Sequence, residues 1–144
     1  MIKKIAVIGL GYVGLPLAIE FGKHHNVIGF DINKKRVSDL SAGIDGTKEI
    51  SAKQIKDSKN LFFTSNENEI KESDIFIVTV PTPIDVTCKP NLEPVKNASK
   101  IISRCMKKNA IIIYESTVYP GCTEEVCVPI LEESNLKFNQ EFFC

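Results

Sequence analysis

The chain has 144 residues, 43% of them hydrophobic, which is enough for one domain with a substantial buried core. Its 18 Lys and Arg residues balance its 18 Asp and Glu residues, so the net charge gives no indication of a nucleic-acid or membrane-surface partner. No apolar run approaches the roughly 20 residues of a membrane span and there is no signal peptide, so we expect a cytoplasmic protein. The five cysteines include no C-x-x-C pair, which predicts reduced thiols and neither a zinc site nor a disulfide framework.

The first predicted unit is a strand, a glycine-rich turn and a helix. Residues 5–8 are apolar and mostly β-branched, as in a strand that is buried on both faces of a parallel sheet. Gly9, Gly11 and Gly14 follow as G-x-G-x-x-G, and apolar residues at helical spacing begin at Leu15. This strand, turn and helix order is the context in which the motif predicts dinucleotide binding.

Each glycine has a separate expected role. Gly9 allows a sharp turn out of the strand, Gly11 lets a pyrophosphate approach the backbone, and Gly14 lets the helix pack closely on the strand. The free N–H groups at the start of the helix would then face the diphosphate. The alternative is a tight turn in an unrelated kind of protein.

A carboxylate at the end of the second predicted strand favours the dinucleotide interpretation. Residues 26–30 predict that strand, and Asp31 follows 22 residues after the first glycine, where a carboxylate would bind the adenosine ribose hydroxyls. It would repel a ribose 2′-phosphate, which favours NAD over NADP. The nearby cations Lys34, Lys35 and Arg36 could instead serve a phosphate, and Asp31 could also cap the next helix.

The rest of the chain alternates between predicted strands and helices. Further strands are expected at residues 61–64, 75–80, 110–114 and near 137–143, and helices at 34–40, 51–57, 92–106 and 123–131. Residues 67–72 are expected to form a short connection. This order predicts an α/β fold, a doubly wound parallel sheet of the Rossmann type with three α/β/α layers, which forms one domain over residues 1–144.

Two threonines directly follow predicted strands, at the edge where ligands bind in such sheets. The prolines of the PTP sequence at 81–83 must end the fourth strand, so Thr82 is expected to contact the cofactor or to be an ordinary turn residue. Thr117 follows the fifth strand and is expected to contact the nicotinamide end or to cap a helix. The polar loop 84–91 is expected to form part of a substrate cleft, with Asn91 or a neighbour capping the helix after it.

Four motifs, GLGYVGLP, FDINKKRV, VTVPTPID and ESTVYPG, occur in this order. Together they resemble the N-terminal NAD-binding domain of the UDP-glucose/GDP-mannose dehydrogenase family over the entire chain. VPTPID, ESTVYPG and the final FFC are similar to the branch that oxidises UDP-N-acetylhexosamines to uronic acids. The resemblance implies pyrophosphate contacts from Gly9, Gly11, Tyr12, Val13 and Gly14, adenosine ribose contacts from Asp31 and Arg36, and nicotinamide-side contacts from Thr82 and Thr117.

The resemblance also implies an activity. Family members oxidise the C6 alcohol of a UDP-sugar by two hydride transfers to NAD, through a thiohemiacetal on a cysteine and a hydrolysed thioester, as in polysaccharide biosynthesis. The catalytic cysteine and lysine belong to a C-terminal part that these residues do not match. Cys105 and Cys127 are expected to pack within helices, and Cys144 to close the sixth strand. We therefore expect the chain as given to bind NAD without oxidising a sugar.

Other interpretations stay open at this point. Family members dimerise through a central helix outside these residues, so the full-length protein is expected to be a homodimer and the fragment can be monomeric. A free-standing NAD-binding or redox-sensing module without catalysis is the alternative function. A hydroxyacyl-CoA or phosphogluconate type of dehydrogenase is disfavoured, because those families do not share VPTP and ESTVYPG. The motifs leave the UDP-sugar itself unspecified.

Overall fold

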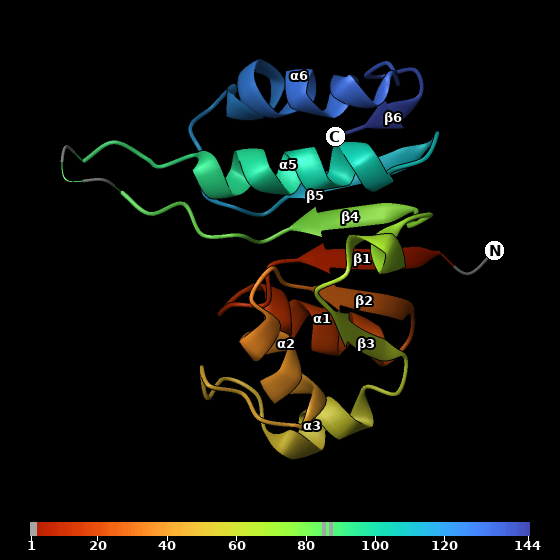
Figure 1. Ribbon diagram of the computed structural model, residues 1–144, viewed down its shortest axis with the longest axis vertical. Helices are drawn as coiled ribbons and strands as arrows, with labels where there is room; N and C mark the ends of the chain where they lie inside the picture. The colour runs from red at the N-terminus through yellow and green to blue at the C-terminus, as the bar shows by residue number, and fades with distance from the viewer. Residues whose placement is uncertain (1–2, 85, 87) are drawn as a thin grey trace.

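The computed structural model describes residues 3–84, 86 and 88–144, and its centre is a parallel sheet (Figure 1). Asp85 and Thr87, in the loop predicted at 84–91, lie outside the described residues. The sheet has six strands in the order β3-β2-β1-β4-β5-β6. The strands are β1 (Lys4–Ile8), β2 (Asn26–Phe30), β3 (Leu61–Thr64), β4 (Ile75–Val78), β5 (Ala110–Tyr114) and β6 (Phe142–Phe143).

The strand order reverses direction at the centre of the sheet. β1 pairs in parallel with β2 on one side and with β4 on the other. The chain first builds outward from β1 to β3, then returns to β4 and builds outward to β6. In sheets of this kind the reversal leaves a crevice at the carboxyl ends of the two central strands, where ligands bind.

Helices cover both faces of the sheet. One face carries α1 (Gly14–Gly22), α2 (Lys34–Ser41) and α3 (Ala52–Asp57), whose apolar side chains pack with alternate strand residues such as Ile5 and Val7. The other face carries α4 (Glu67–Ile70), α5 (Glu93–Cys105) and α6 (Val128–Leu131), which pack with Ala6 and Ile8. This confirms the predicted doubly wound, three-layer α/β fold.

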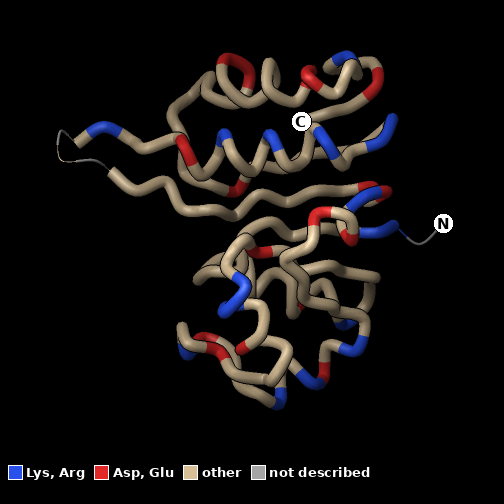
Figure 2. The backbone as a smooth tube through the Cα atoms, viewed as in Figure 1, with Lys and Arg blue, Asp and Glu red and all other residues tan. Residues whose placement is uncertain are grey.

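Helix α5, on the second face, is amphipathic. It buries Val95, Ala98 and Ile102 against the sheet. Lys and Arg residues recur along its other side (Figure 2). The N-cap residue is Leu92, a neighbour of Asn91, and it makes no side-chain capping bond. The Asn91 side chain accepts a hydrogen bond from the Glu93 amide at 3.0 Å and so binds one of the free N–H groups at the start of the helix.

Three local predictions differ from the structure. The connection expected at 67–72 contains the short helix α4, because the Asn66 side chain accepts from the Asn68 amide and caps it. Strand β4 ends at Val78, two residues early. The helix expected at 123–131 begins as a π-helical turn, Thr123–Cys127, because Pro129 has no N–H for the Glu125 carbonyl and the bonding pattern widens.

The five cysteines are free thiols. Cys105 and Cys127 are buried in helical segments, which confirms the packing role expected of them. Cys122 is buried as well, whereas Cys88 and Cys144 are exposed. In the part of the chain that the structure describes, no helix has the length and apolar character needed to cross a bilayer.

Candidate functional site

The turn between β1 and α1 requires glycine at two positions, for different reasons. Gly9 has a φ of +98°, in the left-handed region that favours glycine. A Cβ on Gly14 would lie 1.8 Å from the Gly9 carbonyl oxygen and 2.3 Å from Thr79 Oγ1. The sharp turn and the close helix packing predicted for these glycines are therefore confirmed.

Gly11 differs from the other two glycines. A Cβ at this position would have no protein atom within 4 Å, so its missing side chain is not required by packing inside the chain. The next two residues are open as well, with Tyr12 70% and Val13 57% exposed. Among the described residues, no backbone acceptor is bonded to the amides of Gly11, Tyr12 and Val13. The turn thus presents unhindered donors at the start of α1.

The backbone of Leu10, at the centre of the turn, is held from both sides. Its N–H donates to Asp31 Oδ2 at 2.9 Å, and its carbonyl oxygen accepts from Arg36 Nε at 2.9 Å. Asp31 Oδ1 accepts from the Asn33 amide, while Asn33, not Asp31, is the cap of α2. Asp31 and Arg36, both predicted as ribose ligands, therefore also fix the shape of the glycine turn.

Two of the three cations that follow Asp31 are paired with carboxylates. Lys35 Nζ lies 2.7 Å from Asp39 Oδ2, one helical turn further along α2. Arg36 Nη1 lies 2.7 Å from Asp45 Oδ1, and the Asp45 side chain has no exposed surface. The charges that could have served a 2′-phosphate are thus largely compensated within the chain.

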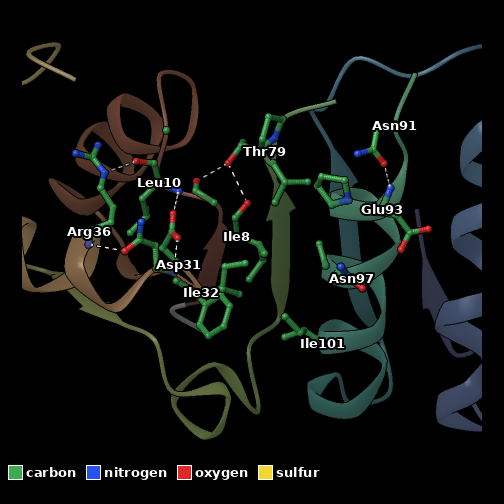
Figure 3. Close-up of a pocket in the computed structure, with 18 residues that line it drawn as sticks. Ile8, Leu10, Asp31, Ile32, Arg36, Thr79, Asn91, Glu93, Asn97 and Ile101 are labelled. Carbon is green, nitrogen blue, oxygen red and sulfur yellow. Dashed lines mark hydrogen bonds between the residues drawn. The ribbon is translucent and has the colours of Figure 1, made fainter. Parts of the chain in front are cut away.

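A cavity of about 530 Å³ opens between the glycine turn and helix α5 (Figure 3). It lies at the carboxyl ends of β1, β2 and β4, at the reversal of strand order. In Figure 3, Asp31 and Arg36 lie on one side, and Asn91, Glu93 and Asn97 on the other. The apolar part of its wall comprises Ile8, Leu10, Phe30, Ile32, Val80, Pro81, Pro94, Ala98 and Ile101.

The structure brings some of the predicted residues to this cavity and not others. Gly9, Gly11, Asp31 and Arg36 line it. The remaining predicted residues, which are Tyr12, Val13, Gly14, Thr82 and Thr117, are not part of its wall. The cavity wall thus contains both residues predicted for the adenosine ribose and two of the five predicted for the pyrophosphate.

Thr82 and Thr117 nevertheless lie together. Thr82 Oγ1 donates to the Thr117 carbonyl oxygen at 2.7 Å. A parallel contact joins the same two loops, because Ser116 Oγ donates to the Val80 carbonyl oxygen at 2.6 Å. The segments after β4 and β5 are therefore connected at the carboxyl edge, although 35 residues separate the two threonines.

Sequence reasoning missed Thr79 and the contribution of α5. Thr79 Oγ1 lies 2.7 Å from the Gly9 carbonyl oxygen and 3.1 Å from that of Ile8, and ties the end of β4 to the glycine turn. A hydroxyl inside the apolar run 75–80 was the available signal. Asn97 and Ile101 line the cavity from α5. Their spacing of four residues places them on one helix face, but nothing local shows what that face meets.

Residues 3–143 match a family model, that of the UDP-glucose/GDP-mannose dehydrogenase family, NAD binding domain. The chain is 55% identical to UDP-N-acetyl-D-glucosamine 6-dehydrogenase of Pseudomonas aeruginosa, over 97% of this chain and 33% of that protein. It is 51% identical to the Salmonella typhi protein of the same name, again over 97% of this chain and 33% of the relative.

A solved structure of a related dehydrogenase has the same fold as this chain. The structure of UDP-D-ManNAc dehydrogenase from Pyrococcus horikoshii superposes with a TM-score of 0.90 at 32% identity, over 96% of this chain and 34% of that one. The chain thus spans about a third of the length of the relatives it matches. From its motifs, its fold and these matches, the chain belongs to the UDP-glucose/GDP-mannose dehydrogenase family and corresponds to its NAD-binding domain.

Proposed function

We propose that this chain is the cofactor-binding domain, residues 1–144, of an NAD-dependent UDP-N-acetylhexosamine 6-dehydrogenase. Relatives at 55% and 51% identity carry the name UDP-N-acetyl-D-glucosamine 6-dehydrogenase. The structural observation that carries the proposal is the continuity between the cavity and the open backbone at Gly11. An adenosine in the cavity would have its diphosphate beside unhindered amide donors.

The cavity fits the adenosine half of NAD in shape and chemistry. Its apolar wall suits a flat purine, for which Ile32 and Ile101 offer side chains from opposite sides. Asp31 accepts one protein donor on each carboxylate oxygen and keeps further acceptor capacity for ribose hydroxyls. We infer that the purine lies between β2 and α5, with its ribose at Asp31.

The diphosphate would lie over the glycine turn. A Cβ at Gly11 would project into open space, where it would occupy room that a bound group needs. The amides at 11–13 and the positive end of the α1 dipole suit an anion. Tyr12 and Val13 would contribute through their backbone, which agrees with the exposure of their side chains.

We assign Arg36 a positioning role in addition to its expected place near the ribose. Its Nε holds the Leu10 carbonyl and its Nη1 is paired with Asp45, so its main contacts are within the protein. Through Leu10 it orients the amides that would meet the diphosphate. Thr82 and Thr117, on the connected loops, would face the nicotinamide side.

Bound NAD would supply the hydride acceptor for oxidation of the sugar C6 alcohol. The residues of this chain bind and orient the cofactor, and the 144-residue chain alone would not oxidise a sugar. In the full-length enzyme, which we expect to be a homodimer, the nucleophilic cysteine, the lysine and most contacts to the UDP-sugar would come from other parts. We expect this enzyme to act in the cytoplasm, in polysaccharide biosynthesis.

Two measurements test this proposal. Calorimetric titration of the 144-residue chain should show micromolar to millimolar binding of NADH and much weaker binding of NADPH. The full-length protein should form two NADH for each UDP-N-acetylglucosamine consumed. Equal affinity for NADH and NADPH would contradict the role of Asp31. Cofactor binding without oxidation of any UDP-hexosamine would favour a binding module over an enzyme.

A further inference from the structure

Asp45 is the centre of the loop between α2 and α3. Its Oδ1 accepts from Arg36 Nη1 at 2.7 Å and from the Thr47 amide at 3.0 Å. Its Oδ2 accepts from the amides of Glu49 and Ile50, each at 2.9 Å. Thr47 Oγ1 lies within 2.7 and 2.9 Å of the two carboxylate oxygens.

This carboxylate is ionised despite its burial. Burial by itself raises the pKa of Asp45, but the hydrogen bonds from Thr47 and Arg36, together with those from the Ile50 and Thr47 amides, outweigh it and hold the pKa well below its usual range. The side chain has no exposed surface. A full negative charge is therefore fixed beneath the surface, next to the guanidinium of Arg36.

Arg36 has almost no freedom to contact a ligand phosphate. Its Nε is bonded to Leu10 O and its Nη1 to Asp45. Its Nη2 is buried and has no partner among the described residues. The side chain as a whole is 14% exposed. The guanidinium thus lies against the ribose end of the cavity without presenting a free fork of donors there.

We propose that Asp45 determines the preference for NAD over NADP by holding and neutralising Arg36. The inference rests on the proposed function, in which the cavity receives adenosine with its ribose at Asp31. With Asp45 ionised, the three groups Asp31, Arg36 and Asp45 carry a net negative charge, which disfavours a 2′-phosphate. Without that charge, Arg36 becomes an uncompensated cation whose planar fork suits a phosphate.

The test is a fluorescence titration of the parent chain and the Asp45→Asn variant with NADH and NADPH. Asn keeps the shape and one acceptor oxygen but removes the charge. We expect the ratio of the NADPH to the NADH dissociation constant to fall by about tenfold or more, because one charge-assisted phosphate contact becomes available. The double variant Asp45→Asn/Arg36→Met should lose this gain.

Two control variants separate charge from loop stability. Asp57→Asn removes an exposed carboxylate at the end of α3 and should leave the ratio unchanged. Thr47→Val removes the hydroxyl donor to Asp45 but keeps the Asp45 charge; it should lower the thermal midpoint without changing the ratio. If Thr47→Val changes the ratio as much as Asp45→Asn, the effect comes from the loop and the inference is wrong.

The inference about Asp45 can also fail while the proposed function holds. If the parent and Asp45→Asn bind NADH equally well and their NADPH to NADH ratios are the same, Asp45 is not a specificity determinant, while the cofactor site stands. If the parent chain binds neither NADH nor NADPH, the proposed function itself fails, and this inference fails with it.

Discussion

Thr82 Oγ1 donates a hydrogen bond to the Thr117 carbonyl oxygen across 2.7 Å and so joins the loops that follow β4 and β5. Both loops leave the carboxyl edge of the sheet, on the same edge as the cavity. Neither threonine lines that cavity. Under the proposed function, the pair would meet the part of the cofactor that extends beyond this cavity.

The first prediction follows from this pair. Thr82→Val removes the donor to Thr117, so the two loops are no longer fixed on the proposed nicotinamide side, and NADH binding should weaken by roughly three- to tenfold. Binding of ADP-ribose, which lacks the nicotinamide, should be unchanged. Thr82→Ser keeps the hydroxyl and serves as the control. Equal weakening for both ligands would place Thr82 away from the nicotinamide side.

The second prediction separates two glycines of the same motif. Gly14→Ala forces a Cβ to within 1.8 Å of the Gly9 carbonyl oxygen and should lower the free energy of unfolding by about 1–3 kcal/mol or more. Gly11→Ala meets no protein atom within 4 Å and should leave the urea midpoint unchanged. It should still weaken NADH binding, because the methyl group lies where the diphosphate must approach.

Retention of full NADH affinity by Gly11→Ala would contradict the diphosphate position. The two single variants are compared in urea denaturation and in NADH titration. Each adds only one methyl group, so a difference between them reflects the position in the motif. Stability and binding should respond to different members of the motif.

The third prediction concerns the carboxylate at the end of β2. Asp31→Asn leaves an acceptor for Leu10 but loses the charged acceptor for the ribose, which should weaken NADH binding by roughly 10- to 100-fold. Asp57→Asn, at the exposed end of α3, is the matched control and should have no effect on titrations. An unchanged NADH affinity in Asp31→Asn would exclude Asp31 as the ribose ligand.

The fourth prediction is a loss of stability at alkaline pH. Burial raises the pKa of Tyr114 above its ordinary value of 10.0, and the hydrogen bond with Ser99, at 2.6 Å, only partly offsets this. The unfolded chain therefore releases the tyrosine proton before the folded one. The Tyr114 contribution is fully present below pH 10 and should decrease above it by about 1.4 kcal/mol per pH unit.

Urea denaturation between pH 8 and 11 checks this sign. Tyr114→Phe lacks the hydrogen bond with Ser99 and should therefore be less stable than the parent at pH 8. Its free energy of unfolding should fall less steeply above pH 10. Tyr12→Phe changes an exposed ring and should retain the parent profile. Parallel profiles for the parent and Tyr114→Phe would show that Tyr114 is not the group responsible.

The parts of the fold that depend on residues adjacent in the sequence could be predicted. The apolar run at 5–8, the largely apolar stretch 27–30 and the glycines between them predicted the first β-α-β unit nearly to the residue, because strand and helix periodicities are local properties. The predictions were less accurate where a single residue changes the hydrogen bonding of a helical segment. Pro129 widens the turn before α6, and Asn66 caps a helix where a connection was expected.

The sequence by itself determined the fold class, the glycine turn and the position of Asp31, because each depends on spacing along a short stretch. Only the tertiary structure decided that Leu10 is held between Asp31 and Arg36, that Arg36 is neutralised by Asp45, and that α5 closes the cavity. The Leu10 backbone meets side chains 21 and 26 residues further along the chain, and the Arg36–Asp45 pair joins α2 to the loop that follows it. Their partners are fixed by packing and side-chain direction, which residue spacing does not encode.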